Sequence, residues 1–149
     1  MTTRIAVDDF LGQHKLAVVG VSRSGKGFGY AAWRALAEKG YEALPVNPGT
    51  ESIGGTRCYA KVADLPRDVG GLVIVVPPAQ TEQVVREAAE AGIRRVWIQQ
   101  GAESEAALEF CREHGIEAVS RECILMFARP GGMHKVHGWI WKAIGKSPR

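Results

Sequence analysis

A chain of 149 residues is long enough for one domain with a buried core, and its formal net charge of +3 is too low for a nucleic-acid-coating face. Hydrophobic residues (46%) and charged residues (23%) occur at proportions ordinary for a soluble globular protein. No run approaches the roughly 20 apolar residues of a membrane span, and Asp8 and Asp9 stand where a signal peptide needs an apolar stretch. We therefore expect a cytoplasmic protein with neither a membrane nor a nucleic-acid partner.

Apolar segments and amphipathic segments alternate along the chain, and glycine follows several of the helical ones. The pattern predicts helices over 7–12, 28–39, 81–91 and 103–114, and strands over 16–20, 42–46, 57–59, 71–76, 95–99 and 116–119. Strands separated by helices of this length pair in parallel, with right-handed crossovers that place helices on both faces. The expected fold is α/β, a doubly wound, Rossmann-like single domain with a mostly parallel sheet of five to six strands.

The expected domain core covers about 15–123, and a C-terminal helical tail is expected over about 131–145. Trp139 and Trp141 in this tail indicate either a hydrophobic anchor or a self-association surface, so a homo-oligomer is one expectation. His134 and His137 stand three apart without a visible third ligand, which argues against zinc. The three cysteines are far apart and form no CxxC pair, so we expect reduced thiols and no metal.

The first predicted strand runs into a glycine-rich, basic loop. The apolar run Leu16-Ala17-Val18-Val19 ends at Gly20, and a helix is expected to begin at Phe28. A strand, a glycine loop and a helix N-terminus aim unpaired backbone N–H groups at one spot, with the positive end of the helix dipole behind them. Arg23 and Lys26 add positive charge, so the segment predicts a phosphate-binding loop.

The loop fits two common nucleotide motifs poorly. Gly20 and Gly25-Lys26 have the spacing of a nucleoside-triphosphate loop, but Gly27 replaces the hydroxyl residue that holds magnesium. For a dinucleotide, Ser22 stands where a second glycine is expected, and Asn47 replaces the acid that holds the ribose of NAD. An NAD(P)-dependent oxidoreductase, with a loop cation on a 2′-phosphate, remains an alternative.

Four linked segments carry a family resemblance: AVVGVSRSGKGFGY, LPVNPGTESIGGTRCYAKVADLP, VVPPAQTEQVVREAAEAGIRRVWIQQGAESEAAL and GIEAVSREC. Together they resemble the CoA-binding domain family, small stand-alone proteins similar to the N-terminal domain of the succinyl-CoA synthetase alpha subunit. The resemblance covers roughly residues 15–123. It implies a Rossmann-type fold that binds coenzyme A or an acyl-CoA, without catalysis of its own. A ligand-free structural or oligomerisation module is the remaining alternative.

The resemblance also implies which residues contact the cofactor. The first loop would cradle the phosphates, the turn after the second strand and the VPP edge would flank the nucleotide, and the QQG segment would close the site. This chain has Thr50 where the synthetase relatives place a lysine, so Arg23 and Lys26 are expected to supply that phosphate contact. The expected cofactor-binding residues are Gly20, Ser22, Arg23, Ser24, Lys26, Gly27, Asn47, Pro48, Gly49, Val76, Pro77, Pro78, Gln99, Gln100 and Gly101.

Overall fold

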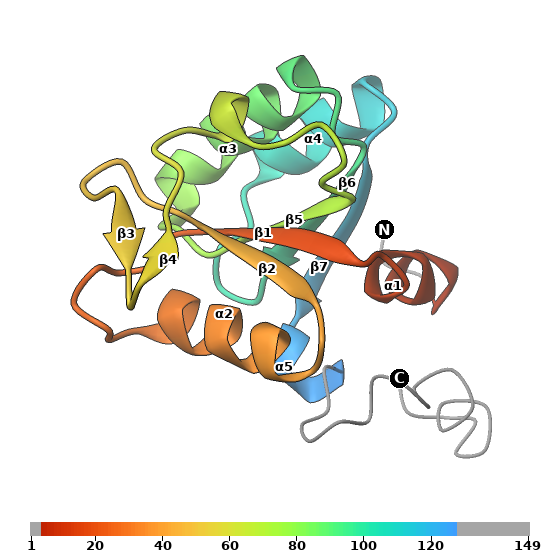
Figure 1. Ribbon diagram of the computed structural model, residues 1–149. Helices are drawn as coiled ribbons and strands as arrows, with labels where there is room; N and C mark the ends of the chain where they lie inside the picture. Colours follow the sequence, from red (N-terminus) through yellow and green to blue (C-terminus); the bar gives the residue numbers. More distant parts are fainter. Residues whose placement is uncertain (1–3, 128–149) are drawn as a thin grey trace, which may run out of the picture.

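The computed structural model describes residues 4–127, so the expected tail with its two tryptophans and two histidines lies outside the described residues. The elements, in chain order (Figure 1), are α1 (Arg4–Leu11), β1 (Lys15–Val19), α2 (Phe28–Glu38), β2 (Glu42–Val46), β3 (Ser52–Ile53), β4 (Thr56–Arg57), the 3-10 helix η1 (Val62–Asp64), β5 (Gly71–Ile74), α3 (Pro78–Glu90), β6 (Arg95–Gln99), α4 (Glu105–Glu113), β7 (Glu117–Glu122) and α5 (Ile124–Phe127).

Five strands form one parallel sheet in the order β2-β1-β5-β6-β7. The chain moves outward from β1 to β2, then returns to β5 on the other side of β1, so the strand order reverses between β1 and β5. Helices α2 and α5 lie against one face, and α3, α4 and η1 cover the other (Figure 1). The expected doubly wound, Rossmann-like α/β fold is confirmed.

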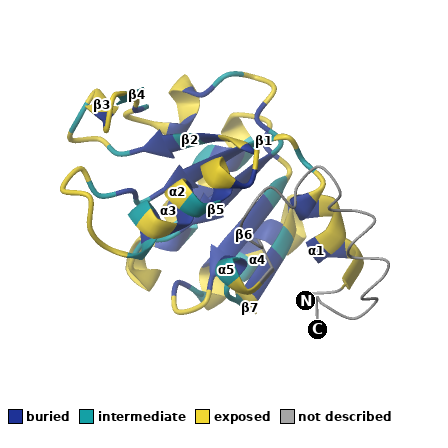
Figure 2. Ribbon diagram, turned by 60° about the horizontal axis from the view of Figure 1, so that its bottom comes forward, coloured by how far each residue is buried: buried dark blue, intermediate teal, exposed yellow. Residues whose placement is uncertain are grey.

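The strands are buried on both faces because their side chains alternate between two hydrophobic layers. In β1, Leu16 and Val18 join the cluster around Trp33 and Trp97, while the intervening Ala17 faces the cluster under α3 and α4. Figure 2 shows the buried strands at the centre and exposed loops at their ends. The core thus fixes the sheet, and the loops at the ends of its strands remain exposed.

Several predicted boundaries shift because of local capping. Helix α3 begins at Pro78 and not at residue 81, since the fixed φ of proline suits the first helical turn. Strand β5 accordingly ends at Ile74 and not at residue 76. Helix α4 begins at Glu105 and not at residue 103, since the Ser104 hydroxyl accepts a hydrogen bond from the Ala107 N–H at 3.2 Å. The last strand, β7, continues to Glu122, three residues beyond the predicted end.

The strand predicted over 57–59 is confirmed in part, because Arg57 belongs to strand β4 and Tyr59 forms a bridge. The segment forms a small antiparallel hairpin of β3 and β4, followed by a single parallel bridge between Val46 and Tyr59. Gly54 and Gly55 both adopt positive φ, +56° and +82°, as a tight two-residue hairpin turn requires. The strands are two residues long each, too short for alternation to reveal them.

Tyr41 joins the start of β2 to the end of α1, and its titration should be visible in the stability of the fold. Its hydroxyl donates to the Leu11 carbonyl at 2.6 Å, and burial raises its pKa from 10.0 to about 12. Between these two values the unfolded chain loses the phenol proton first. Stability should therefore fall by about 2 kcal/mol as the pH rises from 10 to 12.

Urea unfolding at neutral and alkaline pH of the parent chain and of Tyr41→Phe measures this effect. The variant should lose about 1 kcal/mol at neutral pH, because the Leu11 carbonyl loses its partner. It should then show a smaller alkaline loss than the parent. An equal alkaline loss in both chains would rule out Tyr41 as its source.

Candidate functional site

The loop between β1 and α2 begins with a close backbone crossing at Gly20. This residue has φ +106°, and its N–H donates to the Val46 carbonyl at 3.3 Å. A Cβ there would lie 1.9 Å from the Val75 carbonyl oxygen. Gly29, in the first turn of α2, packs against Gly20 just as tightly, since its Cβ would lie 2.2 Å from the Gly20 oxygen. These glycines bring the start of α2 against the ends of β1 and β5.

Within the loop, the serines hydrogen-bond to each other. The Ser22 and Ser24 hydroxyls are 2.7 Å apart, and the Ser24 N–H donates to the Ser22 hydroxyl at 3.1 Å. The Gly25 N–H donates to the Ser22 carbonyl at 3.3 Å, which closes a turn. Arg23 and Lys26 are exposed on this turn. The loop therefore has a defined shape that presents its two cations to solvent.

Asn47, at the end of β2, connects this loop to the neighbouring turn. Its amide donates to the Val21 carbonyl at 2.7 Å, and its side-chain oxygen accepts from the Gly49 N–H at 2.6 Å. The Arg23 guanidinium donates to the Gly49 carbonyl at 3.1 Å. Both ends of the Asn47 amide are thus used within the protein, where an NAD-binding domain would place an acid for the ribose.

Two helix N-termini reach the same edge of the sheet. Gly27 precedes α2 with φ +90° and ψ 166°, and Pro77 precedes α3. Within residues 4–127, neither helix start receives a side-chain capping hydrogen bond. The N–H groups of a first helical turn have no partner inside the helix, and the helix dipole makes their end positive. The start of α2, beside Arg23 and Lys26, is therefore suited to an anion.

A cleft of about 540 Å³ opens beside Gly20 on the face covered by α3 and η1. Of the predicted residues it brings together Gly20, Asn47, Pro48 and Val76, one group from each of three strand ends. The other predicted residues do not line it. The cleft wall also includes Val19, Val46, Ala60, Lys61, Val62, Ala79, Gln80, Gln83, Val84 and Glu87.

The sequence prediction missed two parts of this wall. Helix α3 contributes Gln80, Gln83 and Glu87, whose spacing of three and four places them on one helix face, a signal that could have been noticed. The segment 60–62 carried no such signal. It reaches the cleft because the chain after the hairpin runs beside the end of β2, a long-range pairing that is invisible in the sequence.

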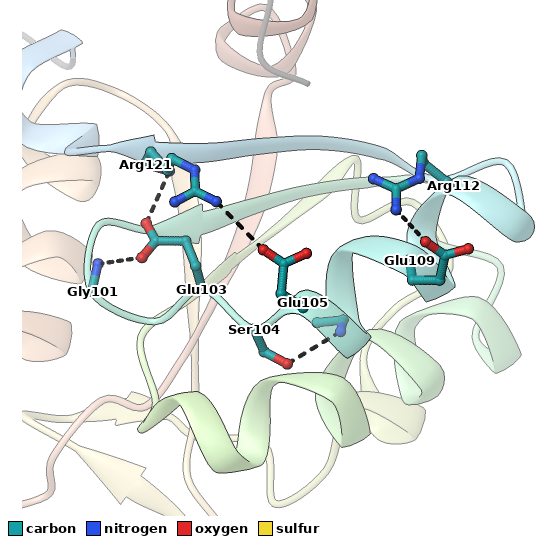
Figure 3. A network of polar contacts seen from close by, with 8 residues as sticks. Gly101, Glu103, Ser104, Glu105, Glu109, Arg112 and Arg121 are labelled. Carbon is teal, nitrogen blue, oxygen red and sulfur yellow. Dashed lines mark hydrogen bonds and ion pairs between the residues drawn. The ribbon is translucent and has the colours of Figure 1, made fainter.

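The QQG segment lies away from the cleft. Gln99 is only 5% exposed, and its side-chain oxygen accepts from the Ile124 N–H at 3.0 Å. Figure 3 shows Glu103 receiving hydrogen bonds from the Gly101 and Arg121 N–H groups, both at 3.0 Å. Arg121 has φ +64° within the β6/β7 register shift. These contacts join the loop after β6 to β7, and neither Gln99, Gln100 nor Gly101 lines the cleft.

Burial favours the protonated form of the two buried thiols, Cys58 and Cys111. Burial raises the pKa of Cys58, although its hydrogen bond to the Asn47 carbonyl opposes this, and burial raises the pKa of Cys111 to about 11. Within the described range 4–127, His, Cys, Asp and Glu side chains form no group of three that could hold a metal ion. No helix in that range is long and apolar enough to cross a lipid bilayer.

The fold and the site define the class of this protein. It is a Rossmann-like domain with a cleft at the point where the strand order reverses. Residues 14–129 match the CoA binding domain family, and the chain belongs to that family. It is 29% identical to the alpha subunit of the ADP-forming acetate–CoA ligase II of Pyrococcus furiosus, over 79% of this chain and 28% of the subunit. The chain thus spans less than a third of that ligase subunit's length.

Smaller proteins match over most of their length. YneT of Bacillus subtilis, described as uncharacterized, is 26% identical over 74% of this chain and 82% of its own. A solved structure of a conserved hypothetical protein from Pyrococcus furiosus is 43% identical, with a TM-score of 0.72, and covers 74% of this chain and 96% of its own. The described core therefore corresponds to nearly whole small proteins and to the CoA-binding part of a ligase.

Proposed function

We propose that this protein binds coenzyme A or an acyl-CoA through the adenosine diphosphate half of the cofactor, and that it catalyses no reaction itself. The observation that carries the proposal is the junction at Gly20. There the uncapped start of α2, the basic loop and the cleft meet at the point where the strand order reverses. Ligands of open α/β sheets bind in this crevice.

The two parts of the site suit the two parts of the ligand. The loop amides, the α2 dipole and the cations of Arg23 and Lys26 would bind the diphosphate. The adenosine would enter the cleft, whose wall includes Val46, Val62 and Val76. A volume of about 540 Å³ falls in the range of about 300–1,000 Å³ typical of small-molecule sites.

The proposed absence of catalysis follows from how the polar side chains are used. The Asn47 amide, the Ser22 hydroxyl and the Gln99 amide are all engaged in hydrogen bonds within the protein. The Cys58 thiol beside Asn47 is held protonated by burial, which leaves it a poor nucleophile. The acetate–CoA ligases carry the family's domain within larger chains, and their activity is not proposed for this protein.

Thermal unfolding with different cofactors tests the proposal. A ligand that binds only the folded chain, at 100 times its Kd, should raise the melting temperature by about 5–10 °C. CoA should do so at lower concentration than NAD or ATP, because the loop and the cleft together match its phosphates and adenosine. Absence of a shift with millimolar CoA would refute the proposal, and a larger shift with NAD or NADP would favour the oxidoreductase alternative.

A further inference from the structure

We infer that Lys61 binds a phosphate on the ribose of the adenosine, and that it makes the cleft select CoA over dephospho-CoA. CoA carries a 3′-phosphate on this ribose, whereas dephospho-CoA, NAD and ATP carry free hydroxyls there. The inference rests on the proposed binding of CoA. It adds a specificity-determining side chain that lies outside the glycine loop.

The hydrogen bonding after the hairpin places Lys61 beside the end of β2. The Tyr59 N–H donates to the Pro45 carbonyl at 2.9 Å, and the Asn47 N–H donates to the Tyr59 carbonyl at 2.9 Å. These bonds pair Tyr59 in parallel with Val46, so the next two residues emerge where β2 ends. Ala60 and Lys61 consequently lie in the same cleft wall as Asn47 and Pro48.

The end of β2 is where a Rossmann-like domain contacts the adenosine ribose. In such domains an acid at this position holds free ribose hydroxyls, and a nearby cation accommodates a ribose phosphate. Here the strands β2, β1 and β5 have the corresponding order, Asn47 replaces the acid, and its amide is already engaged. A cation without an acid is the arrangement expected for a phosphorylated ribose.

The charges around the cleft support two separate phosphate positions. Arg23 and Lys26 lie on the loop at the α2 start, whereas Lys61 is the cation among the residues that line the cleft. Its side chain is exposed, and no ion pair joins it to another residue in the described part of the chain, 4–127. One cationic group would then face the diphosphate, and a second would face the ribose.

The carboxylate of the cleft lies at a distance from the α3 start. Glu87 follows Gln80 by seven residues, which is about 10 Å along a helix. Its carboxylate accepts a hydrogen bond from the Gln83 amide at 3.1 Å. Glu87 lines the same cleft as Lys61, but within residues 4–127 the two side chains form no ion pair, so the Lys61 ammonium stays available to an anion.

Titration calorimetry with CoA, dephospho-CoA, NAD and NADP tests the inference on the full chain and on Lys61→Gln. The parent chain should bind CoA about tenfold more tightly than dephospho-CoA, the gain of one charge-assisted hydrogen bond. In Lys61→Gln this ratio should fall close to one, with dephospho-CoA binding unchanged. Arg67→Gln, the same charge change at an exposed position before β5, should keep the parent ratio.

The outcomes separate the inference from the proposed function. An unchanged ratio in Lys61→Gln, or equal weakening of both ligands, would overturn the role of Lys61 and leave CoA binding intact. Failure of the parent chain to bind either ligand would overturn CoA binding itself. Tighter binding of NADP than of CoA would overturn the selection of CoA. The unliganded melting temperature of the variant should match that of the parent, because Lys61 is exposed.

Discussion

Replacement of Gly20 by alanine should lower the free energy of unfolding by about 2–5 kcal/mol. Two costs add at this position. The residue adopts φ +106°, which strains any side chain, and the new Cβ would lie 1.9 Å from the Val75 carbonyl oxygen. The oxygen belongs to the backbone that follows β5, so it cannot move aside without disturbing the sheet. Urea unfolding monitored by tryptophan fluorescence measures the loss.

Two neighbouring glycines provide matched controls that separate these costs. Gly29→Ala adds a Cβ 2.2 Å from the Gly20 oxygen, at a residue with ordinary helical φ, and should cost about 1–3 kcal/mol. Gly27→Ala meets nothing within 4 Å and should lose only the energy of its unusual backbone conformation, about 1–3 kcal/mol. Gly20→Ala should exceed both. Equal losses at all three positions would contradict the close crossing at Gly20.

The sheet, and the loop at its edge, were predictable because their signals are local. Unbroken apolar runs such as the one ending at Val19 identify buried parallel strands, and Gly20 and the glycines after it identify the loop. The same patterns also gave the family, which the match over residues 14–129 confirms. The segments with strong periodicity were therefore sufficient to predict both the fold class and the family.

The cleft was only partly predictable, because the strand order decides which loops lie close enough together to line it. The sequence indicates that the segments after β1, β2, β5 and β6 share one edge, but it does not give their separation. Strand β5 lies between β1 and β6, so the loop after β6 begins about 10 Å from the loop after β1. The Gln99 side chain therefore accepts a hydrogen bond from α5, and the Gly101 N–H donates to Glu103, whereas Lys61 reaches the cleft beside a single long-range bridge.

Removal of both loop cations should weaken CoA binding and reduce its salt dependence. The double variant Arg23→Gln with Lys26→Gln should raise the Kd for CoA by about 10- to 100-fold, because two charge-assisted contacts to the diphosphate are lost. Salt screens exposed charges, so CoA binding by the parent chain should weaken with ionic strength more steeply than binding by the variant. Calorimetry at low and high salt measures both quantities.

A control variant that removes the same number of positive charges separates local phosphate contacts from the effect of the protein's net charge. Arg34→Gln with Arg67→Gln removes two exposed cations, one on α2 and one before β5, neither of which lines the cleft. This pair should change CoA affinity by less than about threefold, because neither side chain lines the cleft and salt screens exposed charges. The two single variants separate the contributions of Lys26 and Arg23 to CoA affinity. Lys26→Gln removes charge alone, while Arg23→Gln also breaks the hydrogen bond to the Gly49 carbonyl. Equal Kd values and salt slopes for the loop variant and the parent would mean that the loop only joins β1 to α2, and that the phosphates bind elsewhere.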